Sequence, residues 1–134
     1  GNCDIAILSA AVADYKIKFI SNQKIKKEEH SLTLELEKTQ DILASLGKLK
    51  NNQLLVGFAL ETDNEITNAI KKLKNKNLDL IVLNSLSDKG AGFGTNTNKV
   101  TLIKRDLSTT NFPLKSKAEV SKDILNEILK LIDA

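Results

Sequence analysis

Three short and nearly continuous runs of apolar residues constrain the fold of this chain more than any other feature. They cover residues 4–8, 53–60 and 78–84. Such runs are typical of strands that are buried on both faces of a parallel sheet, whereas half-exposed strands alternate. Residues 41–50 and 65–76, between the runs, carry apolar side chains at helical spacing. Because strands and helices alternate, we predict an α/β fold: a Rossmann-like, three-layer, mostly parallel sheet with right-handed crossovers.

The rest of the chain extends this pattern. We predict a fourth strand at residues 99–104. Two Ser/Thr-x-x-Glu capping boxes, which begin at Thr62 and Ser116, predict where two helices start. The helix after Ser116 carries an amphipathic stripe to the end of the chain. With 134 residues the chain has the length of one domain, so we predict a single domain over residues 1–134.

Residues 16–38 interrupt the alternation of strands and helices. Their first part is rich in Lys and Glu and too highly charged to pack in a core. Residues 31–38 alternate apolar and polar side chains, which predicts a half-exposed strand. We therefore predict a protruding β-arm, or flap. In α/β folds, an excursion after the carboxyl end of a strand often covers a ligand site.

Composition and charge exclude several classes of function. The chain has 20 Lys and Arg residues against 17 Asp and Glu, a net charge of +3, which is too small a surplus to indicate a nucleic-acid partner. No apolar run approaches the ~20 residues of a membrane span, and the single Cys excludes a disulfide framework. We expect a cytoplasmic protein with no nucleic-acid or membrane partner. Because the sequence contains no Met, we also expect it to be a piece of a longer or processed chain.

Four charged residues are candidates for phosphate and metal binding. Asp14 follows a run of small residues after the first strand, where a carboxylate can hold a divalent cation or simply cap a turn. Lys24 lies in the charged arm, which is either an anion-binding flap or a solvated hairpin. Lys72 and Lys76 share one helix face, where they suit either a triphosphate or the negative end of the helix dipole. Local patterns alone favour the structural alternative for all four.

The order of seven motifs is more specific than any one of them. Together they resemble the phosphopantothenate–cysteine ligases, the synthetase half of the bifunctional bacterial coenzyme A flavoprotein, over nearly the whole chain. The motifs are AAVADY (10–15), KIKK (24–27), DILA (41–44), GFALET (57–62), KLKNKNLDLIVLN (72–84), GFGTNTNKVTLI (92–103) and SKAEVSKDIL (116–125).

The resemblance implies a two-step ligation in coenzyme A biosynthesis. CTP activates the carboxylate of 4′-phosphopantothenate as an acyl-cytidylate and releases pyrophosphate. The amine of cysteine then displaces CMP and gives phosphopantothenoylcysteine. Mg²⁺ and lysines would offset the charge on the phosphates.

The resemblance also implies partners and missing parts. Members of the family are dimers, so it implies a homodimer in which the arm takes part. FMN is expected only in a decarboxylase half that is absent here. The front of the ligase domain, with an Asn needed for activation, is also expected to be missing, and the chain alone is then expected to be inactive.

Site residues are carried over by position. The resemblance places Lys24 on a flexible flap that contacts the reacting phosphates, which makes it the expected catalytic residue, and Asp14 is the expected metal ligand. One departure is Thr39-Gln40, where the family usually has Asn-Pro, a change that alters local rigidity more than chemistry. The expected nucleotide-binding residues are Ser9, Ala10, Asp14, Lys24, Gln40, Asp41, Ile42, Leu43, Phe58, Lys72 and Lys76.

Two alternative functions stay open at this point. One is a non-catalytic α/β module for nucleotide binding or dimerisation, with a solvated lysine surface. The other is a ligase of the same family that uses ATP in place of CTP. Nucleotide binding tests the first alternative, and a comparison of CTP with ATP tests the second.

Overall fold

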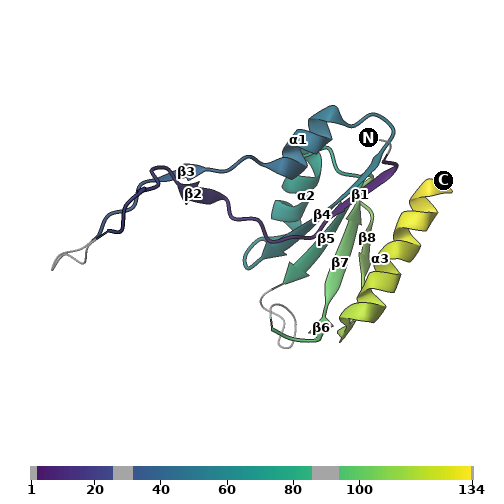
Figure 1. Ribbon diagram of the computed structural model, residues 1–134. Coiled ribbons are helices and arrows are strands. Elements are labelled where there is room, and N and C mark those ends of the chain that lie inside the picture. Colours follow the sequence, from purple (N-terminus) through teal and green to yellow (C-terminus); the bar gives the residue numbers. More distant parts are fainter. Residues whose placement is uncertain (1–2, 26–31, 86–93, 134) are drawn as a thin grey trace.

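A five-stranded sheet lies at the centre of the computed structural model, which describes residues 3–25, 32–85 and 94–133 (Figure 1). Its strands are β1 (Ile5–Leu8), β4 (Leu54–Glu61), β5 (Leu80–Ser85), β7 (Val100–Lys104) and β8 (Thr109–Asn111), in that order across the sheet. β1, β4 and β5 are parallel neighbours, whereas β7 lies antiparallel to β5, and β8 antiparallel to β7. Because β8 is antiparallel to β7, it points in the same direction as β1, β4 and β5, and only β7 points in the opposite direction. The predicted mostly parallel α/β sheet is confirmed.

Helices cover both faces of this sheet. α1 (Ile42–Leu49) and α2 (Glu65–Asn75) lie on one face, and α3 (Lys117–Ile132) lies on the other (Figure 1). Along β4, Leu55 faces the cluster beneath α1 and α2, while its neighbour Val56 faces the cluster beneath α3. In β5, Ile81 faces the cluster beneath α1 and α2, and Leu80 faces the cluster beneath α3. Both faces of the central strands are therefore buried, which explains why their sequences are continuously apolar.

The two predicted capping boxes have different outcomes. The box at Ser116 is confirmed: its hydroxyl accepts a hydrogen bond from the Glu119 amide (3.2 Å), and the Glu119 carboxylate accepts one from the Ser116 amide (3.0 Å). The box at Thr62 is wrong. α2 begins after Asn64, which has a left-handed φ of 47° and no side-chain cap. β4 continues to Glu61, so the chain needs the next three residues to turn into the helix, and Thr62 lies too early to cap it.

The predicted arm is an antiparallel ribbon that protrudes from the body of the molecule (Figure 1). It consists of β2 (Tyr15–Ile17) and β3 (Leu36–Lys38), with an ion pair of 3.0 Å between Lys16 and Glu37 across the strands. Of residues 32–38, the described part of the strand predicted over residues 31–38, only the last three form a strand. Residues 26–31, which include part of the charged run, lie outside the described residues.

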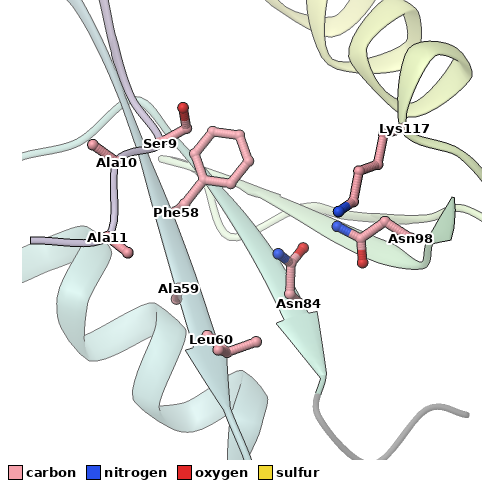
Figure 2. Close-up of a pocket in the computed structure, with 9 residues that line it drawn as sticks. All are labelled: Ser9, Ala10, Ala11, Phe58, Ala59, Leu60, Asn84, Asn98 and Lys117. Atoms are coloured by element: carbon pink, nitrogen blue, oxygen red, sulfur yellow. The ribbon is translucent and has the colours of Figure 1, made fainter. Parts of the chain in front are cut away.

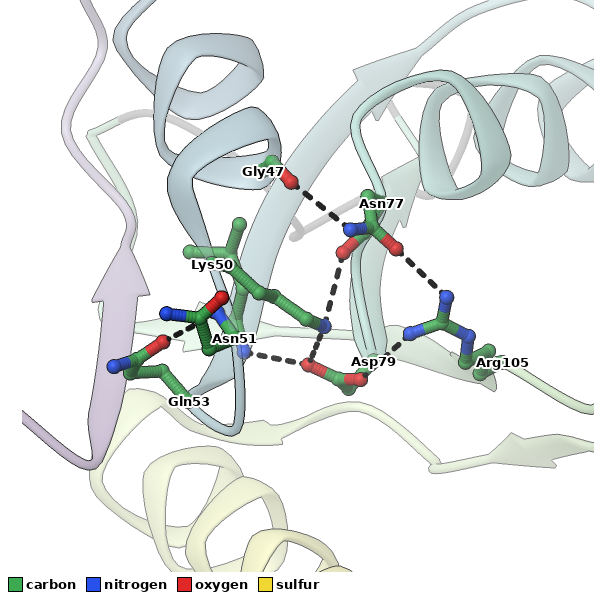
Figure 3. A network of polar contacts seen from close by, with 8 residues as sticks. Gly47, Lys50, Asn51, Gln53, Asn77, Asp79 and Arg105 are labelled. Atoms are coloured by element: carbon green, nitrogen blue, oxygen red, sulfur yellow. Dashed lines mark hydrogen bonds and ion pairs between the residues drawn. The ribbon is translucent and has the colours of Figure 1, made fainter.

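At the amino-terminal edge of the sheet, a polar network fixes the helices to the strands (Figure 3). The carboxylate of Asp79 accepts hydrogen bonds from the Leu55 amide (2.7 Å) and from the buried ammonium of Lys50, and it also contacts Arg105 (3.3 Å). Asn77 adds a bond of 2.9 Å to the carbonyl of Gly47. These contacts join the end of α1 to the start of β5. They lie at the edge of the sheet opposite the carboxyl ends of the parallel strands.

Two short strands complete the fold near that carboxyl-terminal edge. β6 (Thr97–Asn98) pairs antiparallel with β9 (Lys115–Ser116), directly before α3. This pairing brings Asn98 close to the first turn of α3. Within residues 3–25, 32–85 and 94–133, no helix is long and apolar enough to cross a membrane.

Candidate functional site

A cleft of about 720 Å³ lies where β1 and β4 end. In α/β sheets, ligands bind at this carboxyl-terminal edge. The cleft brings together ten of the eleven residues expected to bind the nucleotide; Lys24 on the arm is not among its lining residues. Its lining consists of Ile7, Leu8, Ser9, Ala10, Ala11, Val12, Ala13, Asp14, Thr39, Gln40, Asp41, Ile42, Leu43, Phe58, Leu60, Lys72 and Lys76.

The segment from Ser9 to Asp14 forms one wall of this cleft from small side chains and backbone. Thr39 fixes its far end, because its hydroxyl donates to the Ala13 carbonyl (2.6 Å) and its amide to the Asp14 carbonyl (2.9 Å). Within the described residues, no group forms a hydrogen bond or ion pair with the Asp14 carboxylate. Mg²⁺ usually takes one or two protein carboxylates and completes its shell with phosphate and water. Although no group of three His, Cys, Asp or Glu side chains gathers in the described part of the chain, Asp14 fits that mode of binding.

Asp41 begins α1 at the opposite wall. Its Oδ1 accepts a hydrogen bond of 2.9 Å from the Ala44 amide, and its Oδ2 lies 2.9 Å from Lys76 Nζ. The hydrogen bond from Ala44, and next the contact with Lys76, hold the pKa of Asp41 below its ordinary value. The aspartate is therefore ionised at neutral pH and both caps α1 and pairs with a lysine of the cleft.

Gly47 allows α1 to approach the end of α2 closely. A Cβ at this buried position would lie 2.0 Å from the carbonyl oxygen of Lys76, so only glycine fits. This approach brings the N-cap of α1 within reach of the lysine. The two helices thus place Asp41 and Lys76 by packing, independently of any ligand.

Lys72 is paired in the same manner with Glu61, the last residue of β4. Its Nζ lies 2.6 Å from Glu61 Oε1, but outside the angular range of a hydrogen bond, so the contact is electrostatic rather than directional. The other oxygen of Glu61 accepts a hydrogen bond of 3.3 Å from Asn68. The Glu61 side chain is 12% exposed and that of Lys72 43% exposed. Both lysines are therefore held at the cleft by carboxylates that an anionic ligand would have to displace.

A second cavity, of about 280 Å³, adjoins the cleft (Figure 2). Its lining residues are Ser9, Ala10, Ala11, Phe58, Ala59, Leu60, Asn84, Asn98 and Lys117, of which the first four and Leu60 also line the cleft. Sequence reasoning missed Asn84, Asn98 and Lys117. The signal for Asn84 was present, since it is a polar residue near the carboxyl end of an apolar strand. Asn98 and Lys117 reach the cavity through the β6–β9 pairing, which no local pattern indicated.

Comparisons with known proteins agree with the motif resemblance. Residues 1–132 match the family described as DNA/pantothenate metabolism flavoprotein, C-terminal domain. The chain is 57% identical over 131 residues to a cysteine/cysteine sulfinic acid decarboxylase from an unknown prokaryotic organism, covering 97% of this chain and 36% of that protein. It is 49% identical over 128 residues to the coenzyme A biosynthesis bifunctional protein CoaBC of Bacillus subtilis, covering 96% of this chain and 32% of the relative.

A solved structure gives the same result for the fold. The crystal structure of the C-terminal domain of a CoaBC protein superposes with a TM-score of 0.75 at 42% identity, covering 97% of this chain and 57% of that one. This likeness confirms the Rossmann-like α/β fold. The chain belongs to the family of DNA/pantothenate metabolism flavoprotein C-terminal domains, which confirms the predicted resemblance. It spans about a third of the length of the curated relatives that it matches.

Proposed function

We propose that the chain forms the nucleotide-binding part of a ligase that joins 4′-phosphopantothenate to cysteine, with CTP as the activating nucleotide. The observation that carries this proposal is the convergence of Asp14, Lys72 and Lys76 on one cleft at the carboxyl ends of parallel strands. Membership of the family and relatives named for coenzyme A biosynthesis support it.

The roles of the residues follow from the chemistry. A carboxylate is a poor electrophile, so its oxygen first attacks the α-phosphorus of CTP, and the bond to the β-phosphate breaks to release pyrophosphate. The amine of cysteine then attacks the acyl carbon, loses a proton and displaces CMP. Lys72 and Lys76 would exchange their carboxylate partners for phosphate oxygens and so lower the negative charge on the leaving group. Asp14 would hold Mg²⁺, and the ion would supply positive charge to offset the charge on the phosphates.

We also propose that two copies associate through the arm. Its apolar side chains face solvent on both sides: Phe19 is 69% exposed, Ile20 85% and Leu36 54%. Apolar patches of this kind mark protein interfaces. Lys24 lies on the same arm and does not line the cleft of its own chain, so a dimer of this kind would let it reach the cleft of the second copy. Sedimentation equilibrium should show a dimer that Phe19→Ser with Ile20→Ser dissociates; a wild-type monomer at high concentration would contradict this part.

Calorimetric titration with CTP and MgCl₂ tests the nucleotide assignment. We expect the wild-type chain to bind CTP more tightly than ATP, and Lys76→Gln to weaken binding by about tenfold, as expected for the loss of one contact to a charged group. Lys122→Gln, on the exposed side of α3, is the matched control and should bind like wild type. A preference for ATP would select the alternative nucleotide, and no binding of either would select the non-catalytic module.

A further inference from the structure

Asn77, directly after Lys76, occupies a backbone position that glycine usually fills. Its φ is 53°, in the left-handed region. The Leu78 amide donates to the Leu73 carbonyl (2.9 Å) across the end of α2. Inside this bond, the Asn77 amide donates to the Lys74 carbonyl (3.2 Å). This is the Schellman motif, in which glycine is favoured because it has no Cβ. Since the backbone alone forms both bonds, the end of the helix does not require an asparagine side chain.

The side chain of Asn77 instead connects α2 to two other parts of the fold (Figure 3). Its Nδ2 donates a hydrogen bond of 2.9 Å to the carbonyl of Gly47 in α1. Its Oδ1 accepts one of 2.7 Å from Arg105, in the turn between β7 and β8. Its backbone carbonyl accepts a third bond, of 3.1 Å, from the buried ammonium of Lys50, the C-cap of α1. The residue after Lys76 is therefore held by both α1 and the sheet.

These bonds determine where Lys76 lies along α1. The backbones approach closely at this point, because a Cβ on Gly47 would lie only 2.0 Å from the Lys76 carbonyl oxygen. From there the Lys76 side chain extends to the beginning of α1, where its Nζ lies 2.9 Å from Asp41 and lines the cleft. Asn77 is not among the described residues that line the cleft. A small displacement of a binding group weakens its contact with a ligand, so Asn77 can affect the cleft without touching a ligand.

We propose that Asn77 is a positioning residue for the triphosphate of the nucleotide: its side chain holds the end of α2 on α1 and so keeps the Lys76 ammonium at the cleft. Arg105 supports this arrangement from the sheet, because it donates to the side-chain oxygen of Asn77. Glycine at position 77 would suit the backbone but would leave the end of α2 without its side-chain bond to α1. This inference rests on the proposed function, since it requires Lys76 to contact a phosphate.

Calorimetric titration of the Asn77→Gly variant with CTP and MgCl₂ tests this role. The substitution removes both side-chain bonds and keeps the left-handed backbone accessible. We expect CTP binding to weaken about three- to tenfold, up to the effect of Lys76→Gln. In the Lys76→Gln background, the same substitution should change CTP affinity less than about twofold, because no ammonium remains to be positioned. A merely structural role would have the same effect in both backgrounds.

Asn64→Gly is the matched control. Asn64 lies at the other end of α2 and is also in the left-handed region (φ 47°), but its side chain forms no capping hydrogen bond. It is exposed, so CTP affinity should stay within about twofold of wild type. Arg105→Ala is a second variant in case Asn77→Gly unfolds, which thermal melting checks. Its side chain is 61% exposed, and its loss should weaken CTP binding in the same direction but by less.

The ionisation of Asp41 provides a measurement that needs no nucleotide. After the hydrogen bond from the Ala44 amide, the contact with Lys76 also lowers the pKa of Asp41. If Asn77→Gly lets the ammonium move away, the pKa of Asp41 should rise toward its value in Lys76→Gln. Carbon NMR of the carboxyl group across a pH titration measures this pKa, which should not change in Asn64→Gly.

Unchanged CTP affinity in a folded Asn77→Gly variant would overturn the inference, and so would an equal loss of affinity in the Lys76→Gln background. Either result leaves the proposed function intact as long as CTP binding depends on Lys76. If the wild-type chain binds no CTP while the pKa of Asp41 rises in Asn77→Gly, the nucleotide part of the proposed function fails and the placement of Lys76 by Asn77 stands.

Discussion

The pairing of Lys72 with Glu61 leads to two substitutions with opposite expected effects on nucleotide affinity. In the structure without ligand, the Lys72 ammonium lies 2.6 Å from the Glu61 carboxylate. A triphosphate must draw the lysine away from that partner. Removing the lysine should weaken binding, whereas removing the competing carboxylate should strengthen it. If the ion pair were purely structural, the two substitutions would not change nucleotide affinity in opposite directions.

The magnitudes follow from the exposure of the pair. The Lys72 side chain is 43% exposed, so solvent screens its ion pair with Glu61. The ion pair is therefore expected to contribute about 0.2–1 kcal/mol. A contact between the ammonium and a phosphate contributes about 1.5–3 kcal/mol. The net loss in Lys72→Gln is then about 1–2 kcal/mol, or roughly 5- to 30-fold in Kd. Glu61→Gln recovers about the energy of the pair, which tightens binding roughly 1.5- to 5-fold.

Calorimetry with CTP at fixed MgCl₂ and low ionic strength measures both effects. Glu61→Gln preserves the shape of the side chain and an oxygen that can accept from Asn68. Asp123→Asn is the matched control, because it removes one carboxylate from a partly exposed lysine pair of 2.8 Å that does not line the cleft. Weaker CTP binding in Glu61→Gln would refute the reasoning, since it would show that Glu61 supports the bound lysine instead of competing for it.

Two further predictions concern stability. Asp41→Ala removes the N-cap of α1 and the partner of Lys76, so the free energy of unfolding in urea should fall by about 1 kcal/mol or more at pH 7; an unchanged urea midpoint would contradict the capping role. Glu127, 5% exposed, lies between Lys104 (2.8 Å) and Lys130 (2.6 Å), and these two contacts, first Lys104 and then Lys130, hold its pKa below the ordinary value of 4.5. The ionised Glu127 therefore stabilises the fold fully above pH 4.5, and this stabilisation is lost as the pH falls through the lower pKa of the folded state. Urea titrations at pH 7 and pH 3 should show that the free energy of unfolding falls less with acid in Glu127→Gln than in wild type.

The layers of the fold were predictable because each depends on a short-range pattern. Residues 80–83 are apolar without alternation, and β5 has Leu80 on the α3 side and Ile81 on the α1–α2 side. The Ser116 box needs only four consecutive residues to close, and it forms as predicted. The Thr62 box has the same local pattern but fails, because β4 extends to Glu61 and the turn into α2 uses Asn64 in the left-handed region.

The cleft was predictable from the order of motifs, whereas the second cavity was not. Its lining requires Asn98 and Lys117 to meet through the β6–β9 pairing, which consists of only two residue pairs. Such short strands carry no periodicity that a sequence can reveal. Of these three residues, only Asn84 could have been predicted from the sequence, because it lies near the end of a buried strand, at the edge where α/β proteins bind ligands.

The structural role of Lys76 is compatible with the role proposed for it in phosphate binding. Its pairing with Asp41 stabilises the end of α2 and the beginning of α1 when no ligand is present. The same pairing holds the ammonium beside the cleft, already placed for a phosphate. When a phosphate takes the lysine, Asp41 still accepts the hydrogen bond from Ala44, so α1 keeps its cap and the carboxylate is not left without a partner. Because each carboxylate has a second donor, Ala44 for Asp41 and Asn68 for Glu61, the lysines can be exchanged at the cost of a screened ion pair and without unfolding a helix end.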